Sequence, residues 1–145
     1  MAHRLAIQSS VPGFGHIWNV SQRVGGRETC PNLPTDVELV KVLIKKALES
    51  PVIVPAARRV PTPPLTVNSQ FDAVVGYWIF RFQDHDGHPI IDGVASPARS
   101  LTYAPGVAWV IAFINFHAFK ADKDFWTNLP QNKTLSQALR SELSR

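Results

Sequence analysis

The clearest pattern of hydrophobic and polar positions is a helical stripe in the middle of the chain. Its members follow one another at steps of four, three, one and three residues: Phe71, Val75, Trp78, Ile79 and Phe82. Side chains at these spacings share one face of an α-helix. Asp72 stands where an N-cap residue accepts a bond from free backbone N–H groups, and Gly87 offers the left-handed conformation that ends many helices. We therefore predict a helix over residues 73–85, in which Gly76 admits a close neighbour.

A second amphipathic segment precedes this helix. Its apolar positions recur at intervals of three and four residues: Val37, Val40, Leu43, Ile44, Ala47 and Leu48. The charged residues between them are assigned to the outer, solvent-facing side: Glu38, Lys41, Lys45 and Lys46. Thr35 and Glu38 have the spacing of a capping box, and Pro34 suits a position just before the first turn. The pattern predicts a helix that starts here and lays its apolar side against the first.

Two further helices are expected toward the C-terminus. One is marked by apolar positions at helical spacing, with two aromatic residues on a flanking face: Val107, Val110, Ile111, Ile114 and Ala118, with Trp109 and Phe113. A shorter helix over residues 135–143 is marked in the same way: Leu135, Ala138, Leu139 and Leu143. Trp78 and Trp109 are expected in the core. Asn115 and His117 are expected to be buried polar groups with satisfied hydrogen bonds, because the rest of their helix is apolar.

The remaining segments predict little regular structure. Residues 5–7 and 17–20 are short apolar runs separated by a Ser-, Pro- and Gly-rich stretch, which indicates two short strands, arranged as a hairpin against the helices. Residues 50–64 contain five prolines and predict a long connection, with a short strand at residues 52–54 and a use in docking a partner. The expected fold is mainly α, a small bundle of three to four helices with a minor N-terminal β-hairpin or short strands.

Composition narrows the class of protein. Residues 1–145 are expected to form a single domain, since a chain of this length can bury a single core and its hydrophobic fraction of 45% is ordinary. The net charge is +4, but the basic residues are scattered along the chain. Scattered charge is typical of a solvated surface, so we expect no nucleic-acid partner.

Cysteine content and targeting signals bear on the compartment. Cys30 is the only cysteine, so neither an internal disulfide nor a cysteine-held zinc is expected, and a reducing compartment fits. The start of the chain lacks the apolar run of a signal peptide, and no stretch approaches the roughly 20 apolar residues of a membrane span. These observations predict a cytoplasmic protein, or one that a signal-independent system exports to the periplasm or to a target cell.

The densest polar cluster is Asp84-His85-Asp86-Gly87-His88, whose residue types serve in zinc sites and in acid–base chemistry. Helix ends also collect these residues for capping, and no second ligand cluster stands at a recognised spacing. Cys30 has no catalytic signature around it that would join it to His16, His85 or His117. A muramidase needs two positioned carboxylates, but the candidates are better assigned to a loop, a capping box and a turn: Glu28, Glu38 and Asp92. We expect no metal and no cofactor, and a binding role is favoured over an enzyme.

The four tryptophans suggest a second kind of site, because aromatic rings stack on sugars and anchor protein interfaces. Trp18 and Trp126 lie in or near connections between the predicted elements. We therefore expect these two side chains to be exposed and available to a ligand or a partner.

The central stretch resembles the peptidoglycan-binding-domain family, small three-helix modules found in many cell-wall hydrolases. The family pattern is Asp-Gly-x-Phe-Gly-Pro-x-Thr-x-x-Ala-Ile-x-x-Phe-Gln, followed by a turn and Asp-Gly-Val-Val. The residues that fall in those places are Asn68, Ser69, Phe71, Ile79, Phe82, Gln83, Asp92, Gly93 and Val94. Those that look like the family's first helix and its approach are Val24, Gly25, Gly26, Asn32, Asp36, Val37, Val40, Leu43 and Ile44.

The resemblance divides the chain into three parts. It covers a core of about residues 25–97, preceded by N-terminal strands over residues 1–24 and followed by a helical extension over residues 98–145. These additions look like variants of the module associated with type VI secretion in Gram-negative bacteria. The resemblance implies a non-enzymatic module that binds peptidoglycan fragments or a secretion-linked protein partner.

Departures from the family pattern fall on the loop ahead of the central helix. The Asp-Gly pair has become Asn68-Ser69, the glycine after Phe71 is Asp72, and the threonine is Val75. The family places this loop near its proposed ligand groove, so the departures favour an inherited scaffold over an inherited ligand. The expected ligand-binding set is Asn68, Ser69, Gln70, Asp72, Gln83, Asp92, Trp18 and Trp126. Two alternatives stay open: a small cell-wall hydrolase or secreted antibacterial toxin that uses residues 84–88, and a pure protein-docking domain.

Overall fold

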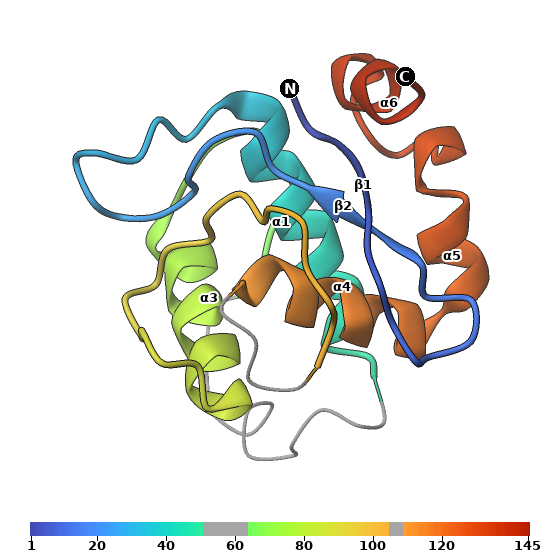
Figure 1. Ribbon diagram of the computed structural model, residues 1–145. Helices are drawn as coiled ribbons and strands as arrows, with labels where there is room; N and C mark the ends of the chain where they lie inside the picture. Colours follow the sequence, from blue (N-terminus) through green and yellow to red (C-terminus); the bar gives the residue numbers. More distant parts are fainter. Residues whose placement is uncertain (51–63, 105–108) are drawn as a thin grey trace.

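The computed structural model describes residues 1–50, 64–104 and 109–145. The predicted strand at residues 52–54, most of the proline-rich connection and Val107 lie outside the described residues. In chain order the elements are β1 (His3–Ala6), β2 (His16–Asn19), α1 (Pro34–Ala47), α3 (Ala73–Asp86), α4 (Val110–Ala121), α5 (Lys123–Thr127), the 3₁₀ helix η1 (Leu129–Gln131) and α6 (Gln137–Leu143). The protein is mainly helical with an N-terminal antiparallel hairpin, which confirms the predicted fold class (Figure 1).

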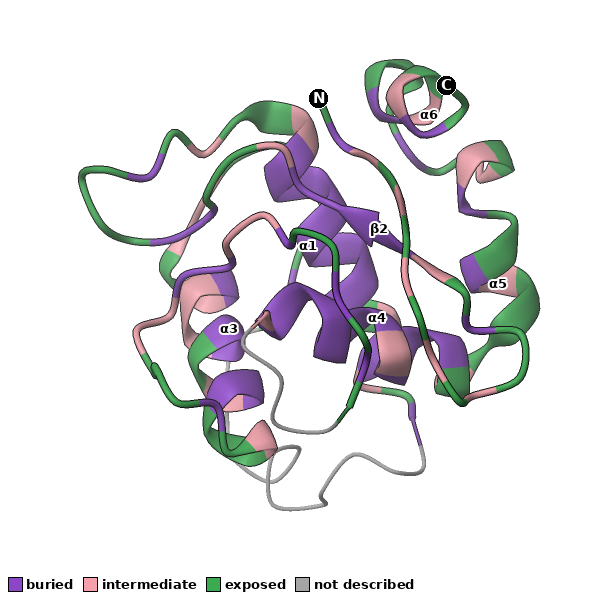
Figure 2. Ribbon diagram, in the orientation of Figure 1, coloured by how far each residue is buried: buried purple, intermediate pink, exposed green. Residues whose placement is uncertain are grey.

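Helices α1 and α4 pack against each other in the middle of the molecule (Figure 1). Both are buried along most of their length, whereas α3, α5 and α6 each keep an exposed side (Figure 2). α4 is apolar around nearly its whole circumference, as expected of a helix with no solvent-facing side. One hydrophobic cluster extends from Ala2 to Leu143 and includes side chains from all of these elements.

The prediction for α3 is confirmed in detail. The Asp72 side chain caps the helix by accepting a bond from the Val75 N–H at 2.9 Å, and Gly87 ends it with a φ of 69°. Val75, Trp78, Ile79 and Phe82 are buried on one face. The fifth member of the stripe, Phe71, lies before the N-cap and packs half-buried against the same core.

The capping box predicted at the start of α1 is not formed. Leu33 is the N-cap residue and makes no side-chain bond to the helix, while Pro34 is the first helical residue rather than the one before it. Proline suits that position, because its missing N–H would have had no helical partner there. The Glu38 carboxylate turns away from Thr35 and accepts bonds from the N–H and hydroxyl of Ser136 at 2.8 and 2.5 Å.

The outer face assigned to α1 is also wrong in part. Lys45 is exposed and Lys46 half-buried, but Glu38 and Lys41 are buried. The reason is that α1 is covered by α4, α3 and α6, so it has almost no solvent-facing side over its first three turns. Polar side chains at these positions must therefore find partners inside the protein.

The N-terminal hairpin pairs Leu5 with Ile17 and Ala6 with His16. Both strands begin earlier than predicted. Two isolated bridges, Gln8 with Thr102 and Val24 with Ala95, attach the N-terminal third to the segment that follows α3. The hairpin therefore lies over α4 rather than standing apart as a separate unit (Figure 1).

The C-terminal part contains elements that the periodicity did not predict. α5 and η1 are each too short to show a helical repeat, and they lead to α6, where Ser136 caps the helix by accepting from the Leu139 N–H. Leu135, Leu139 and Leu143 are buried as expected, while Ala138 is exposed.

The α4 prediction needs a correction at its start. Trp109 is the N-cap of α4 and is half-buried, rather than a core residue within the helix. Within the described residues, no helix combines the length and apolar character needed to cross a bilayer.

Candidate functional site

Three segments far apart in the sequence meet beside the N-terminal half of α3. They are the loop of residues 24–32, the turn of residues 68–72 and the segment of residues 92–95. The bridge between Val24 and Ala95 joins the first segment to the third, with N···O distances of 3.0 and 2.8 Å. These are the segments that carry the residues resembling the peptidoglycan-binding-domain family.

The ring of Phe71 fills the space where these segments meet. A Cβ atom on Gly26 would lie 3.8 Å from this ring, and one on Gly76 would lie 3.1 Å from it. A Cβ on Gly93 would come within 3.3 Å of the Gly76 backbone oxygen. The close approach expected at Gly76 is therefore observed: Phe71 packs between Gly26 and Gly76, and Gly93 approaches α3 at Gly76. We call residues 25–28, 68–72 and 92–94 the three-segment surface.

Lys41 fixes the turn within this surface. Its side chain is fully buried, and its ammonium donates to Asn68 Oδ1 at 2.7 Å, to the Gln70 carbonyl at 2.6 Å and to Asp72 Oδ2 at 2.7 Å. A buried ammonium is tolerated only when its donors are all paired, as they are here. Lys41 thus brings together three of the predicted ligand-binding residues, Asn68, Gln70 and Asp72. One acceptor oxygen of each is bonded to Lys41 and is not available to a ligand.

Asp72 is held in its charged form. Desolvation alone would raise its pKa, but the bond and charge of Lys41, together with bonds from the backbone N–H groups of Val75 and Val74, lower the pKa below its ordinary value. The carboxylate is 41% exposed, so one side of it faces solvent while the other holds Lys41.

Gln83 holds the segment after α3 in place. Its Oε1 accepts from the N–H groups of Asp92 and Gly93 at 3.1 and 2.8 Å, and its Nε2 donates to Asp92 Oδ1 and the Val94 carbonyl, both at 3.1 Å. Gln83 is 1% exposed. Its amide has no capacity left for a ligand, and its role is to position Asp92.

Other side chains of the three-segment surface remain available. Ser69 and Gln70 are exposed, and neither side chain makes a hydrogen bond within the described part of the chain. Arg27 is 63% exposed and lies 3.9 Å from Asp92 Oδ2, a distance that gives only a weak ion pair. The surface thus offers a hydroxyl, an amide and a guanidinium side by side with two carboxylates.

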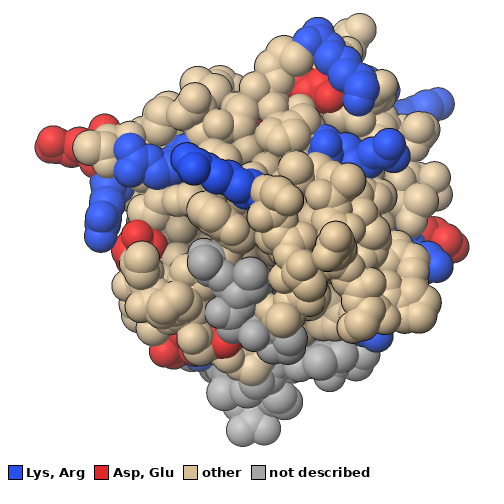
Figure 3. Space-filling view, viewed as in Figure 1, with Lys and Arg blue, Asp and Glu red and all other residues tan. Residues whose placement is uncertain are grey.

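The distribution of basic side chains can be followed on one face of the molecule. On the face shown in Figure 3, Lys and Arg side chains lie in several separate groups over different elements. This distribution fits the scattered charge seen in the sequence.

Trp18 and Trp126 are buried, at 3% and 1% exposure, so the prediction that they are exposed is wrong. Trp18 Nε1 donates to the Trp126 carbonyl at 2.8 Å, and Trp126 Nε1 donates to Asn115 Oδ1 at 3.0 Å. Asn115 Oδ1 also accepts from the Trp18 N–H at 2.8 Å, and its Nδ2 donates to the carbonyls of Trp18 and Ile111. We call Trp18, Trp126 and Asn115 the tryptophan centre. Asn115 is a satisfied buried polar group, as predicted.

The 84–88 cluster forms the end of α3. The Gly87 N–H donates to the Asp84 carbonyl and the His88 N–H donates to the Gln83 carbonyl, the pattern of a left-handed helix stop. His85 is exposed, with its ring centre 6.5 Å from that of His117. Among the described residues, no group of three His, Cys, Asp or Glu side chains is arranged to hold a metal ion.

The cysteine and the histidines lie in different environments. Cys30 is buried against Gly25: a Cβ atom added to that glycine would lie 3.2 Å from the Cys30 sulfur. Within the described residues, no hydrogen bond joins this sulfur to a histidine. His16 stacks on Trp126, and His117 lies against Phe113 with its ring centre 4.3 Å away. Burial lowers the pKa of each of these two histidines to about 4, helped by the charge of Arg4 on His16 and of His85 on His117. Both imidazoles are therefore neutral at pH 7.

Sequence reasoning missed the buried charges of α1, which organise three different regions. Asp36 accepts from the N–H and hydroxyl of Ser21 and from the Gln22 N–H, while Glu38 holds the start of α6. Lys41 holds the turn before α3. A signal was present for Lys41, because it stands four residues after Val37 and so shares the apolar stripe of α1.

Comparison with known proteins adds no assignment. The chain matches no protein-family model, no curated protein and no solved structure.

Proposed function

We propose that this chain is a non-enzymatic binding module that engages peptidoglycan through the three-segment surface. One observation carries the proposal: three segments that are separate in the sequence, and that include residues resembling the peptidoglycan-binding-domain family, meet beside α3 through the Val24–Ala95 bridge and the approach of Gly26 and Gly76 to Phe71. That surface combines a fixed backbone, held by Lys41 and Gln83, with exposed polar side chains on top of it.

The chemistry of the surface suits such a ligand. Peptidoglycan presents amides, hydroxyls and carboxylates, and the exposed side chains of Arg27, Ser69 and Gln70 supply complementary donors and acceptors. Fixed backbone is an advantage, because a site that is already ordered loses less conformational entropy on binding. Engagement of the wall also requires export, and we propose the type VI secretion route that the resemblance suggests.

A second candidate function is the docking of a protein partner. Among the described residues, the large apolar side chains that are exposed include three on or just after α3: Phe80 at 42%, Ile90 at 61% and Ile91 at 42%. A Cβ on Gly93 would lie 3.9 Å from the Phe80 Cβ, so at least Phe80 borders the three-segment surface. Exposed apolar side chains next to a polar rim are typical of protein interfaces.

Co-sedimentation with purified sacculi tests the proposal, with release of soluble muropeptides measured in the same tubes. Wild-type protein is expected to pellet with sacculi and to release nothing. Release that is lost in His85→Ala would favour the hydrolase alternative and overturn the proposal. If the protein neither binds sacculi nor releases muropeptides, the proposal is overturned in favour of a docking domain. A Phe80→Asp variant then tests whether the exposed apolar side chains are needed to capture a protein partner.

A further inference from the structure

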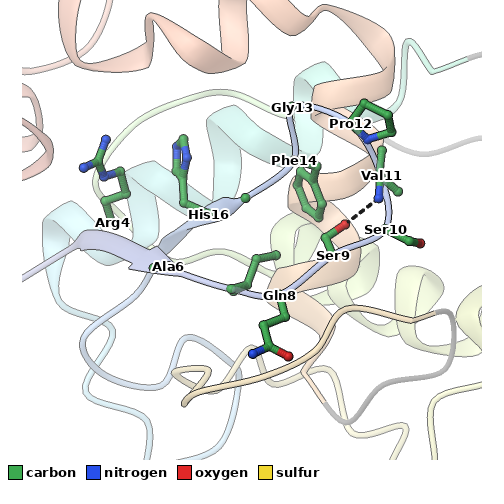
Figure 4. Close-up of a pocket in the computed structure, with 12 residues that line it drawn as sticks. Arg4, Ala6, Gln8, Ser9, Ser10, Val11, Pro12, Gly13, Phe14 and His16 are labelled. Carbon is green, nitrogen blue, oxygen red and sulfur yellow. Dashed lines mark hydrogen bonds between the residues drawn. The ribbon is translucent and has the colours of Figure 1, made fainter.

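A hollow in the N-terminal hairpin lies outside the three-segment surface. Its volume is about 830 Å³, and it is lined by Arg4, His16 and the connection of residues 6–15 (Figure 4). This size falls in the range of sites for small molecules. The connection supplies apolar walls from Val11, Pro12 and Phe14 beside polar side chains such as Gln8.

The position of Arg4 follows from the strand register. Ala6 pairs with His16 and Arg4 pairs with Trp18, so Arg4 and His16 are diagonal neighbours on one face of the hairpin. Figure 4 shows both side chains projecting from the same side of the strands. Arg4 is exposed and makes neither an ion pair nor a hydrogen bond with any described residue. Its guanidinium is thus a positive charge with no carboxylate beside it.

His16 has bonding capacity that the protein does not use. Its Nε2 is buried and makes no hydrogen bond to any described residue, and the ring stacks on Trp126 with a centre distance of 4.4 Å. The other ring nitrogen, Nδ1, is not enclosed and also has no partner in the described part of the chain. With the proton on Nδ1, the neutral ring presents one donor toward the hollow.

The rim of the hollow carries a second cation and free backbone donors. Lys123 Nζ would lie only 2.8 Å from a Cβ on Gly13, so the ammonium lies over this glycine. The N–H groups of Ser10, Gly13 and Gly15 have no partner among the described residues. No aspartate or glutamate lines the hollow within the described ranges. Donors and positive charge without a counter-ion are the features of an anion site.

We propose that this hollow binds a small monocarboxylate with a compact body, with Arg4 pairing with the carboxylate and His16 donating to it. A guanidinium matches the planar carboxylate with two parallel hydrogen bonds. The apolar walls take the remainder of the ligand. The site is separate from the three-segment surface, so this inference does not rest on the proposed function.

N-acetylmuramic acid is a suitable probe, because it carries one carboxylate on a sugar ring. N-acetylglucosamine, which lacks this group, and inorganic phosphate are the comparison ligands. Binding is measured by isothermal titration calorimetry and by the ring signals of His16 in NMR spectra. We expect N-acetylmuramic acid to bind, and N-acetylglucosamine and phosphate to bind at least tenfold more weakly. We also expect the bound carboxylate to raise the His16 pKa, because its negative charge opposes the positive charge of Arg4.

Arg4→Gln removes the charge and is matched by Arg99→Gln, another exposed arginine that does not line the hollow. We expect at least a tenfold loss of affinity in Arg4→Gln and wild-type affinity in Arg99→Gln. Equal binding by both variants would overturn the proposal, as would no binding to the wild type. Tighter binding of phosphate than of N-acetylmuramic acid would overturn the choice of carboxylate.

Discussion

The three-segment surface and the tryptophan centre both contain residues that the sequence singles out for ligand binding, yet their polar groups are used differently. In the tryptophan centre, the indole N–H groups of Trp18 and Trp126 and both ends of the Asn115 amide are bonded inside the protein. On the three-segment surface, Ser69 and Gln70 keep side chains with no bond to the described residues.

This difference shows that residue type alone does not identify a binding site. A tryptophan ring stacks on a sugar only when its face is exposed, and an asparagine amide binds a ligand only when its hydrogen-bonding groups are not already paired; Trp18 and Trp126 are buried and the Asn115 amide is fully bonded. The tryptophan centre is therefore a structural unit that fastens β2 and α5 to α4. The three-segment surface has polar side chains whose hydrogen-bonding groups are not used within the described part of the chain. Variants at the two places should therefore affect stability and binding differently.

The largest effect is expected for Asn115→Ala. The change leaves the Trp18 N–H and carbonyl and the Trp126 indole without partners in a buried place, each at a cost of roughly 1–3 kcal/mol. We expect the free energy of unfolding to fall by about 3–5 kcal/mol in urea titrations. Asn128→Ala, at an exposed position, is the control and should change stability by less than about 0.5 kcal/mol. Equal stability of the two variants would show that the tryptophan centre is not structural.

Acid should weaken the region around the tryptophan centre next. His16 and His117 have a pKa of about 4 in the folded protein and about 6.5 when unfolded. Between these values the unfolded chain binds protons that the folded protein does not, so stability falls as the pH falls from 6.5 toward 4. We expect a loss on the order of a few kcal/mol in urea titrations. His117→Gln should flatten this dependence, whereas an unchanged slope would contradict the burial argument.

On the three-segment surface, Lys41→Met is expected to cost about 1–3 kcal/mol, less than the loss at Asn115, because Asp72 can turn to water once its partner is gone. The Asp72 pKa should rise in this variant, since the bond and charge of Lys41 help to lower it. Carboxyl carbon signals in NMR spectra measure this pKa. Lys45→Met, on the exposed side of the same helix, is the control. An unchanged Asp72 pKa in Lys41→Met would refute the role given to Lys41.

The smallest effect on stability is expected for Ser69→Trp. This variant should nevertheless bind sacculi much more weakly than the wild type. Ser69 is exposed and its side chain makes no bond to the described residues, so stability should change by less than about 0.5 kcal/mol. The large side chain would cover the three-segment surface and lower the affinity for sacculi at least tenfold. Ser141→Trp, on the exposed side of α6, is the matched variant. Similar binding by both would place the sacculus contact elsewhere.

α3 could be predicted because local rules acted alone there, whereas the Thr35–Glu38 capping box failed because Glu38 binds Ser136 instead. The limits of α3 follow from Asp72 and Gly87, because an N-cap and a left-handed stop depend on residues next to each other. The burial of Lys41, Glu38 and the tryptophans could not be predicted, since it depends on which distant segments cover them. Lys41 needs a turn that lies 27 to 31 residues away in the sequence, and Trp18 needs a helix 97 residues away.

In the candidate site, too, some features follow from the local sequence and others depend on distant segments. The resemblance implies that Ser69 and Gln70 lie in a loop near a ligand groove, and both residues are exposed in the structure. Gln83 was chosen from the family pattern, but its amide bonds only to the backbone and side chain of residues 92–94. Arg27 gave no signal in the sequence, and its place on the surface follows from the approach of Gly26 to Phe71 and from the 3.9 Å distance between Arg27 and Asp92.

An NMR titration of ¹⁵N-labelled protein with a disaccharide–tetrapeptide muropeptide tests the central claim most directly. The Arg4→Gln variant is used, so that the hairpin hollow does not contribute. We predict amide shifts confined to residues 25–28, 68–72 and 92–94, with the indole signals of Trp18 and Trp126 unchanged. Shifts centred on those indoles, or none at millimolar muropeptide, would contradict the account.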